Sequence, residues 1–559
     1  SRAKKQSDVI LSLFLLKSNE KHIRVKDLKE RSQASAAIIK TLIDKGVLDE
    51  YFLNEDRVSF EGEIKEQKEL SESQQTAYET IKSSFVQNDV SLFYGVTSSG
   101  KTEIYIKLIQ DYLDQEKQIL YLLPEIALTT QLISRLQNYF GDKIAVFHSK
   151  YSINERVEVW NNLLAKKAKA QIIIGARSSV LLPFSNLGLI VVDEEHETSF
   201  KQFDPAPRYH ARDAAIVLAK LHGAKVLLGS ATPSIESFFN AKKGKYGLIV
   251  LKERFGNILL PDINLIDIKE KFKKRLMKGH FSDTLIKAIE EALDEKEQVI
   301  LFQNRRGYSP ILECNDCGNA AQCPNCDVSL TYHQYKNQLR CHYCGYQMAM
   351  QHNCISCGSN KLSTKGFGTE QIEEEIKQLF PEAKVGRMDL DTTRGKHGYK
   401  KIISAFENQE LDILVGTQML TKGLDFKHVS LVGIMNADSM LNFPDFRSHE
   451  RSYQLMQQVA GRSGRYKKRG KVLIQTYNPY HKILHQVSTN AYEEMYEEQL
   501  DQRHIYKYPP TNRLIKISFK HRDYSMVSEG AQWFWKSLDM LFKPNVLGPE
   551  FPAIARIRN

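Results

Sequence analysis

Runs of consecutive apolar residues recur along this 559-residue chain, and several are followed by a helical pattern. Between residues 63 and 252 the main runs read SLFYG, QILYLL, KIAVF, AQIIIG, LGLIVV and KVLLG. A strand that is apolar at every position, and not only at alternate ones, is typical of a parallel sheet buried on both faces. The pattern therefore predicts a doubly wound α/β domain at residues 63–252.

A second series of apolar runs follows later in the chain and reads QVILF, AKVGRM, LDILVG, VSLVGIM and GKVLIQ. It predicts a second α/β lobe at residues 253–483, which has no phosphate-binding loop of its own. The fold class that we predict is therefore α/β.

Three short helical patterns open the chain, SDVILSLFLL, VKDLKERSQ and ASAAIIKTLIDKG, before VLDEYFLNEDRVSF, which reads as two strands with a polar tip. This order is that of a winged helix, which we place at residues 1–62. Winged helices bind DNA and protein surfaces alike, so the sequence leaves the partner open.

The composition, 42% hydrophobic and 26% charged, is that of an ordinary soluble protein. No apolar run reaches the roughly 18–20 residues that span a bilayer, and no signal peptide is visible at the amino end. We therefore expect no membrane partner and a cytoplasmic location. The formal net charge of +11 favours polyanionic partners only weakly over a chain of this length.

All eight cysteines lie between positions 314 and 357 and form four CxxC pairs. A thiolate pair at this spacing sits on a tight turn with both sulfurs facing one tetrahedral ion. Disulfides fit less well, because a secreted chain would spread its bridges. We predict two structural zinc ions, with an iron–sulfur cluster as the alternative that four cysteines also allow.

The spacing of the four pairs favours a nested arrangement, because 14 residues separate the second and third pairs and only five and nine lie on either side. The inner ion would take the second and third pairs: Cys323, Cys326, Cys341 and Cys344. The outer ion would take the first and last: Cys314, Cys317, Cys354 and Cys357. Four thiolates leave no open position for a catalytic water, so residues 312–359 are expected to form a folded module inserted in the second lobe.

A phosphate-binding loop is predicted where an apolar strand runs into GVTSSGKT and then into an apolar-periodic helix, the setting that GxxxxGK[ST] requires. Lys101 would reach the β- and γ-phosphates of ATP, and Thr102 would ligate Mg²⁺. The nucleotide would be bound by Gly95, Val96, Thr97, Ser98, Ser99, Gly100, Lys101 and Thr102.

Two further motifs fit the same chemistry. The apolar run LGLIVV ends in DEEHE, where Asp193 would hold Mg²⁺ and Glu194 would polarise the attacking water. In the second lobe, QQVAGRSGR places Arg462 and Arg465 three residues apart beside glycine turns, which suits recognition of a γ-phosphate across a cleft.

GVTSSGKT, DEEHE, GSAT, GTQMLTKGLDF and QQVAGRSGR stand in the order of the superfamily 2 helicase motifs, and the chain resembles that superfamily. With four nested CxxC pairs, GARSS and NRRGYSPILEC, it is similar over nearly its whole length to the PriA family of replication restart helicases (primosomal protein N′). The resemblance implies two RecA-like lobes and a C-terminal α+β domain at residues 484–559. It also implies a domain that binds the 3′ end of DNA before the winged helix. No segment of this sequence corresponds to that domain, and the C-terminal domain is expected to be incomplete in it.

The resemblance also implies residue roles. Gln74 would recognise adenine, and His196 would couple the site to Ser230, Ala231 and Thr232. Gln458 would act with Arg462 and Arg465, the two arginine fingers. Gly416, Thr417, Lys422, Gly423 and Asp425 belong to a further motif of the second lobe.

Residues 199–213, SFKQFDPAPRYHARD, interleave aromatic and cationic side chains. Aromatic rings stack on the bases of a single strand and cations hold its phosphates, although a surface loop with inward rings fits the composition equally. The family has an aromatic-rich loop that couples DNA binding to hydrolysis. The residues expected in this role are Phe200, Lys201, Phe203, Arg208, Tyr209, His210 and Arg212.

The function implied is an ATP- and Mg²⁺-dependent 3′→5′ DNA helicase that acts on branched and single-stranded DNA at stalled forks in the bacterial nucleoid. Its expected partners are single-stranded DNA-binding protein and the proteins that load the replicative helicase. Two alternatives stay open: another zinc-containing superfamily 2 motor, and a fork-binding scaffold whose ATPase is regulatory.

Overall fold

The chain divides into two compact units, Ser1–Ser59 and Phe60–Asn559. No described helix is long and apolar enough to cross a membrane. The computed structural model describes residues 2–17, 23, 25–48, 63–124, 130–148, 151–304, 311–314, 321, 324, 330–333, 337–340, 346–355, 357–365, 368–389, 392–393, 398–421, 424, 426–441, 446–464, 469–543, 545–546 and 549.

The first unit contains the three helices that the sequence predicts: α1 (Arg2–Lys17), α2 (Val25–Ser32) and α3 (Ala36–Asp44). Their apolar faces meet in a small core formed by Val9, Leu28, Ala34, Ile39 and Leu42. The two strands predicted for the wing lie almost wholly outside the described residues.

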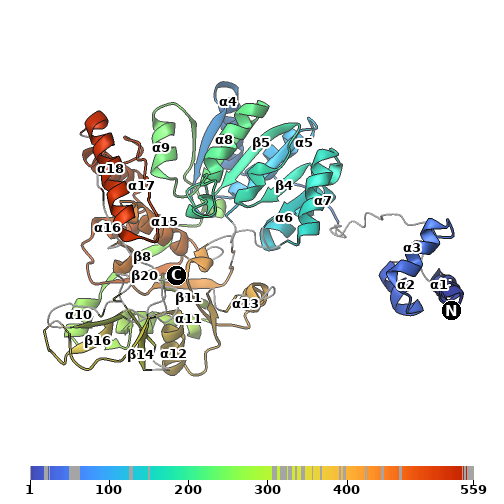
Figure 1. Cartoon of the computed structure of the whole chain (residues 1–559). Coiled ribbons are helices and arrows are strands. Elements are labelled where there is room, and N and C mark those ends of the chain that lie inside the picture. The colour runs from blue at the N-terminus through green and yellow to red at the C-terminus, as the bar shows by residue number, and fades with distance from the viewer. Residues whose placement is uncertain are drawn as a thin grey trace. The chain divides into compact units, whose positions relative to one another are not determined.

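A seven-stranded sheet forms the first lobe (Figure 1). Its strands follow the order β3-β4-β2-β5-β6-β1-β7, and neighbouring strands are parallel. The six predicted runs all become strands, and the sequence missed only the edge strand β7. The strands are β1 (Val90–Gly95), β2 (Gln118–Leu122), β3 (Ile144–Phe147), β4 (Ile172–Gly175), β5 (Leu187–Asp193), β6 (Lys225–Ser230) and β7 (Gly247–Leu251).

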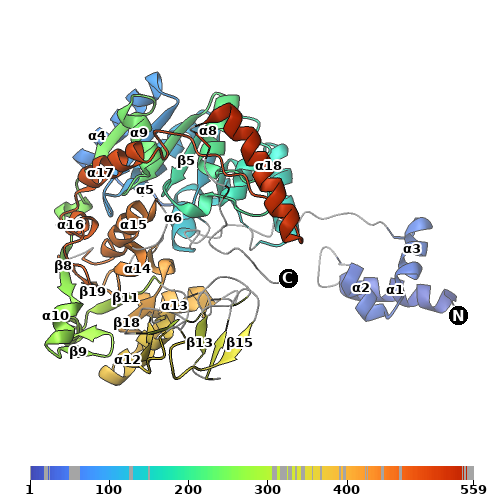
Figure 2. The same ribbon diagram turned by 60° about the vertical axis from the view of Figure 1, so that its left-hand side comes forward.

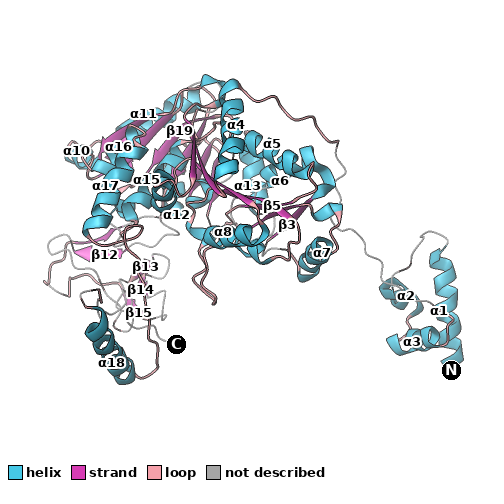
Figure 3. Ribbon diagram, turned by 90° about the horizontal axis from the view of Figure 1, so that it is seen from above, coloured by secondary structure: helices cyan, strands magenta, loops and turns pink. Residues whose placement is uncertain are grey.

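Helices cover both faces of this sheet, which Figure 3 draws with strands in magenta and helices in cyan. Because successive side chains of a strand point to opposite faces, Ile190 packs in one core cluster and Val191 in the other. One face carries α4 (Glu72–Gln87), α5 (Lys101–Leu113) and α6 (Thr130–Phe140). The other carries α7 (Ile153–Leu164), α8 (Ala211–His222) and α9 (Ile235–Lys242).

The second lobe has a six-stranded parallel sheet in the order β17-β18-β11-β19-β20-β8. The α/β prediction is confirmed here too, with β8 as the strand that the sequence missed. The strands are β8 (Asp262–Asp267), β11 (Gln298–Phe302), β17 (Val385–Met388), β18 (Ile413–Gly416), β19 (Val429–Ile434) and β20 (Lys471–Thr476), beside a hairpin of β9 (Met277–Lys278) and β10 (Phe281–Ser282).

Helices also cover both faces of the second sheet. One core cluster takes α10 (Ile268–Lys273), α11 (Asp283–Asp294) and α12 (Thr369–Leu379). The other takes α13 (Gly398–Glu407), α14 (Asp438–Leu441), α15 (Ser448–Ala460), α16 (Lys482–Ser488) and α17 (Tyr492–Ile505). This second cluster continues into the first lobe, because α17 lies beside α9 (Figure 2) and Tyr492 packs on Phe238.

Short 3₁₀ helices join several of these elements: η1 (Gly141–Lys143), η2 (Ala168–Ala170), η3 (Arg177–Leu181), η4 (Thr198–Phe200), η5 (Phe255–Asn257) and η7 (Gln418–Thr421).

The cysteine-rich segment forms a sheet of its own between β11 and α12, as the prediction of an inserted module requires. Its antiparallel strands pair in the order β15-β14-β13-β12-β16 and supply nothing to the parallel sheet. They are β12 (Ile311–Cys314), β13 (Thr331–His333), β14 (Gln338–Arg340), β15 (Gln347–Ala349) and β16 (Leu362–Lys365). The sheet therefore extends slightly beyond the predicted limits of 312–359.

The C-terminal segment differs from the prediction. The predicted boundary at residue 484 falls inside α16, because α16 and α17 pack into the core of the second lobe. After β20 the described residues form helices and no strand, so the α+β prediction is not met here. Ile515 of this segment is exposed. A strand there would need a neighbour to pair its backbone groups. The last helix among the described residues of this segment is the long α18 (Tyr524–Phe542).

Candidate nucleotide-binding and DNA-coupling site

The phosphate loop joins β1 to α5 at the carboxyl edge of the first sheet. Gly100 caps α5 in the left-handed region, with φ of 81°, a conformation that favours glycine. The Nζ of Lys101 donates to the carbonyl oxygen of Gly95 at 2.7 Å, so the ammonium group lies inside the loop. The hydroxyl oxygens of Ser98 and Ser99 are buried with no hydrogen-bond partner in the described structure. Cation, hydroxyls and helix N-terminus fit a triphosphate.

Gln74 lies against this loop rather than in open space. Its Nε2 donates to the carbonyl of Ser99 at 3.0 Å, and its Oε1 accepts from the backbone N–H of Ser71 in a capping box. A Cβ at position 100 would stand 2.1 Å from Nε2, so the contact needs a glycine there. Both ends of the amide are therefore engaged by protein groups, and adenine recognition stays a prediction.

Asp193 ends β5 beside the phosphate loop. Its carboxylate accepts from the hydroxyls of Tyr105 and Tyr121 at 3.3 and 3.2 Å. Burial, then the neighbouring Glu194, raises the pKa of Asp193 to about 6. Burial and Asp193 in turn raise the pKa of both tyrosines well above 10, so they stay donors. A buried carboxylate that prefers to be neutral fits a divalent cation, which would favour its ionised form. No motif in the sequence pointed to the two tyrosines.

Glu194 and His196 meet a residue of the other lobe. Gln458 on α15 approaches His196 with its Nε2 2.7 Å from the ring Nε2 and 3.4 Å from Oε2 of Glu194. If the amide donates to the imidazole, the ring proton sits on Nδ1, which lies 2.7 Å from Oγ of Ser230. These contacts bring the predicted residues of both lobes together. Glu194 itself has φ of 51°, which costs about 1–3 kcal/mol for a residue other than glycine.

Glu195, which the sequence did not single out, anchors the aromatic loop to the DEEH segment. This carboxylate is fully buried and accepts from Nη1 of Arg212 at 2.9 Å and from the hydroxyls of Ser234 and Ser237. Burial alone would lower the pKa of Arg212, but the carboxylates of Glu195 and Asp213 outweigh it and raise that pKa. Arg212 is therefore committed to an internal ion pair. The sequence predicted that it would hold DNA phosphates, and the structure corrects that prediction.

The rest of the loop divides into buried and exposed rings. Phe203 is 68% exposed, whereas Phe200 is fully buried and has no ring face free for a base, a correction to the prediction. Tyr209 is partly buried, and its hydroxyl donates to the carbonyl of Arg177.

Three polar residues of the loop complete it. The Nζ of Lys201 donates to the carbonyl of Arg208 at 2.7 Å, while the Arg208 side chain is exposed. Burial and the Arg212 cation lower the pKa of His210 to about 4, so this ring is neutral at pH 7.

The turn at residues 461–464, called the arginine turn below, lies close to the phosphate loop. Arg462 is buried and donates to the carbonyl of Leu424. A Cβ at Gly461 would stand 2.6 Å from Cγ2 of Thr97, so the two lobes come within side-chain contact at this point. Gly416 ends β18 and Thr417 is buried beyond it. Arg465, Lys422, Gly423 and Asp425 lie outside the described residues.

The side chains of two cysteines, Cys354 and Cys357, are described. The N–H of Gly358 donates to the carbonyl of Cys354 at 2.8 Å, and Gly358 has φ of 73°. This tight turn fits a thiolate pair on one ion. The described residues bring together no cluster of three or more metal-ligating side chains, because the other six cysteine side chains lie outside them. The nested pairing therefore stays a prediction.

Four family models match the chain. A winged helix domain of the PriA helicase (Bacteroidota) matches residues 1–54, the DEAD/DEAH box helicase domain 71–239, the cysteine-rich region of the PriA DNA helicase 323–348, and the helicase conserved C-terminal domain 360–467. The replication restart protein PriA of Bacillus subtilis (strain 168) is 40% identical over 570 residues, which cover 100% of this chain and 70% of the relative. The chain belongs to the PriA family.

A second PriA, from Synechocystis sp., is 38% identical over 98% of this chain and 67% of its own length. A solved structure of RecG bound to a three-way DNA junction aligns with 92% of this chain and 55% of its own, at 14% identity and a TM-score of 0.46. That level of likeness carries no argument about function. Family membership and both helicase domains confirm the predicted class: the chain is a DNA helicase and ATPase of replication restart, with ATP, Mg²⁺ and zinc as its cofactors.

Proposed function

We propose that this PriA-family helicase moves 3′→5′ on DNA, unwinds the lagging strand at stalled or collapsed forks and helps to reload the replicative helicase. The observation that carries a motor function is the contact of Gln458 with Glu194 and His196, since it places groups of both lobes around one site. A motor needs such a contact because ATP hydrolysis at one lobe must change the conformation of the other. Polarity, fork recognition and loading rest on the family resemblance.

Each residue of the site has a chemical part in this proposal. Lys101 holds the β- and γ-phosphates, while Thr102 and Asp193 hold Mg²⁺, which neutralises charge on the phosphates. Glu194 orients the attacking water, and Gln458 senses Glu194 from the other lobe. Arg462 and Arg465 stabilise the charge that develops on the γ-phosphate.

The aromatic loop supplies the link to DNA. Phe203, which is exposed, would stack on a base of the single strand. Arg212 would transmit a movement of the loop to the DEEH segment, because its partner Glu195 directly follows Glu194. The loop is thus tied to the ATP site through one buried ion pair.

The remaining parts serve partners. Two zinc ions, with closed shells of four cysteines each, would hold the inserted module for strand separation or docking. The winged helix would bind branched DNA. Single-stranded DNA-binding protein and loader proteins are the expected protein partners, at forks in the cytoplasm.

The experiment is strand displacement on a forked duplex, with ATP hydrolysis measured with and without the fork. We expect the wild-type protein to carry two zinc ions per chain and to unwind the fork, and Lys101→Ala to bind the fork and unwind nothing. If Lys101→Ala unwound as well as the wild type, or if the wild type bound forks without unwinding them, the protein would act as a scaffold with a regulatory ATPase.

A further inference from the structure

Arg254 is a buried arginine on the segment that leads from β7 of the first lobe to β8 of the second. Its side chain is only 5% exposed, although arginine is rarely buried unless its donors are satisfied. No catalytic motif contains it. Packing alone does not account for a buried arginine between the two lobes.

The guanidinium group bonds to three different segments. Its Nε donates to the carbonyl of Thr97 in the phosphate loop at 3.1 Å. Its Nη1 donates to the carbonyl of Leu259, further along the connecting segment, at 3.2 Å, and to the carbonyl of Gly464 in the arginine turn at 3.1 Å. A single side chain of the connecting segment thus touches the phosphate-binding element of one lobe and the arginine turn of the other.

Neighbouring backbone bonds hold the phosphate loop from the same side. The N–H of Phe255 donates to the carbonyl of Ser98, and the N–H of Val96 donates to the carbonyl of Leu251, both at 3.0 Å. In a trans peptide the carbonyl and the following N–H point in opposite directions. Fixing the Thr97 carbonyl therefore also fixes the direction of the Ser98 N–H within the loop.

We propose that Arg254 is a positioning residue for ATP hydrolysis, which holds the arginine turn of the second lobe in register with the phosphate loop of the first. The proposal rests on the proposed role of Arg462 and Arg465 as fingers. Arg254 would act without contacting the nucleotide. It acts through the backbone at Gly464, three residues from the close approach of Gly461 to Thr97.

This role predicts a particular kinetic pattern for Arg254→Lys. Lysine keeps the positive charge but offers a single ammonium group, which does not reproduce the planar fork that reaches three carbonyls. ATP affinity should stay within about threefold, because the backbone bonds of Phe255 to Ser98 and of Val96 to Leu251 still hold the phosphate loop. The kcat for DNA-stimulated hydrolysis should fall about 10- to 100-fold, since a displaced catalytic group costs that much.

Arg469 provides a matched control. Its Nε donates to the carbonyl of Leu260 at 2.8 Å, so it ties the second lobe to the same connecting segment. No bond links it to the phosphate loop among the described residues, and its side chain is half exposed. Arg469→Ala should therefore leave kcat unchanged.

The decisive test is a double-mutant cycle measured as kcat for ATP with single-stranded DNA present. Arg254→Ala combined with Arg462→Ala should be no slower than Arg462→Ala alone, because both changes disable the same turn. Multiplied losses, a normal kcat in folded Arg254→Lys, or a raised KM with unchanged kcat would each overturn the proposal. So would failure of both Arg254 variants to fold in a thermal melt, since Arg254 would then be a stability residue. If Arg462→Ala itself hydrolysed normally, the finger role in the proposed function would fail instead.

Discussion

At the scale of single residues, two adjacent carboxylates of this site have different surroundings. Asp193 accepts hydrogen bonds from two tyrosine hydroxyls and has a raised pKa, as expected for a buried carboxylate that binds a divalent cation. Glu194 turns away in the left-handed region and faces Gln458 and His196. The backbone geometry thus separates a metal-binding carboxylate from one that faces the water and the second lobe.

Glu194→Gln should test this division. The amide keeps the shape of the side chain, so we expect ATP affinity to stay within about threefold of the wild type. Turnover should fall by about 10²–10⁴, the usual cost of losing a positioned base. Nucleotide binding and steady-state hydrolysis are the measurements. Glu79→Gln, an exposed change on α4, is the control and should hydrolyse normally; near-normal turnover in Glu194→Gln would remove that residue from its role.

At the scale of elements, residues 199–213 work as one anchored loop. Arg177 donates to the carbonyls of Ser199 and Lys201, and Arg212 ties the far end to Glu195. Phe200 is the core residue of the loop and Phe203 its exposed ring. The anchoring fixes which ring faces solvent, so only some of the predicted aromatic residues are available to a base.

Phe203→Ala should therefore weaken stimulation of the ATPase by single-stranded DNA while basal hydrolysis stays within about twofold. A stacked base is worth ~1–3 kcal/mol, so the DNA concentration needed for half-maximal stimulation should rise about fivefold or more. The measurement is hydrolysis against DNA concentration. Tyr480→Ala, which removes an exposed ring of the second lobe, is the control. Unchanged stimulation in Phe203→Ala would show that the ring does not meet DNA.

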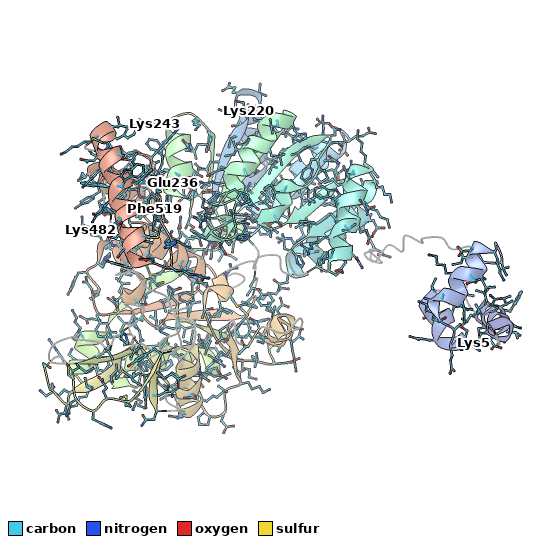
Figure 4. All side chains as sticks on the ribbon, viewed as in Figure 1. Lys5, Lys220, Glu236, Lys243, Lys482 and Phe519 are labelled. Atoms are coloured by element: carbon cyan, nitrogen blue, oxygen red, sulfur yellow. The ribbon has the colours of Figure 1, made fainter. Side chains whose placement is uncertain are left out.

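At the scale of the whole molecule, a buried ion network joins the two lobes through α17. Arg503 is 2% exposed and bonds to Glu450 of α15 at 2.6 Å and to Glu236 of α9 at 3.3 Å (Figure 4 labels Glu236). Arg447 reaches Glu236 as well. Burial raises the pKa of Glu236, but these two arginines lower it overall. Glu450 also accepts from the first N–H of α9 at 2.8 Å, so α17 helps to hold both lobes together.

Arg503→Met should destabilise the protein by about 3 kcal/mol, because it leaves two largely buried carboxylates with less compensation. Chemical denaturation with a fluorescence readout measures the loss. Lys482→Met is the control, since Lys482 bonds to Glu498 from a side chain that is 78% exposed and such pairs are worth under about 1 kcal/mol. Equal losses in the two variants would show that the buried network does not hold the lobes.

The sequence by itself determined both parallel sheets and the order of the catalytic motifs. Continuous apolar runs identify strands buried on two faces, and GxxxxGK[ST] or CxxC carries its geometry within a few neighbouring residues. It missed β7 and β8, which both lie at an edge of their sheets. The β8 sequence DINLID interrupts its apolar residues with polar ones, and GLIVL of β7 is a short apolar run that periodicity alone does not assign to a strand. The α+β domain that the family resemblance implied at residues 484–559 is not met among the described residues, which form helices and no strand after β20. Strand pairing requires a neighbour that a local pattern does not supply.

Only the tertiary structure decided which side chains work together across the chain. Tyr105 and Tyr121 on Asp193, Glu195 on Arg212, and Arg254 between Thr97 and Gly464 all join residues that lie far apart in sequence. Tertiary structure also decided burial: Phe200 is buried and Arg212 largely so, which makes both unavailable to DNA, whereas Phe203 is exposed. A local pattern records the type and spacing of residues. The burial of a side chain and its hydrogen-bond or ion-pair partners depend on how distant segments pack. That packing also raised the pKa of Asp193.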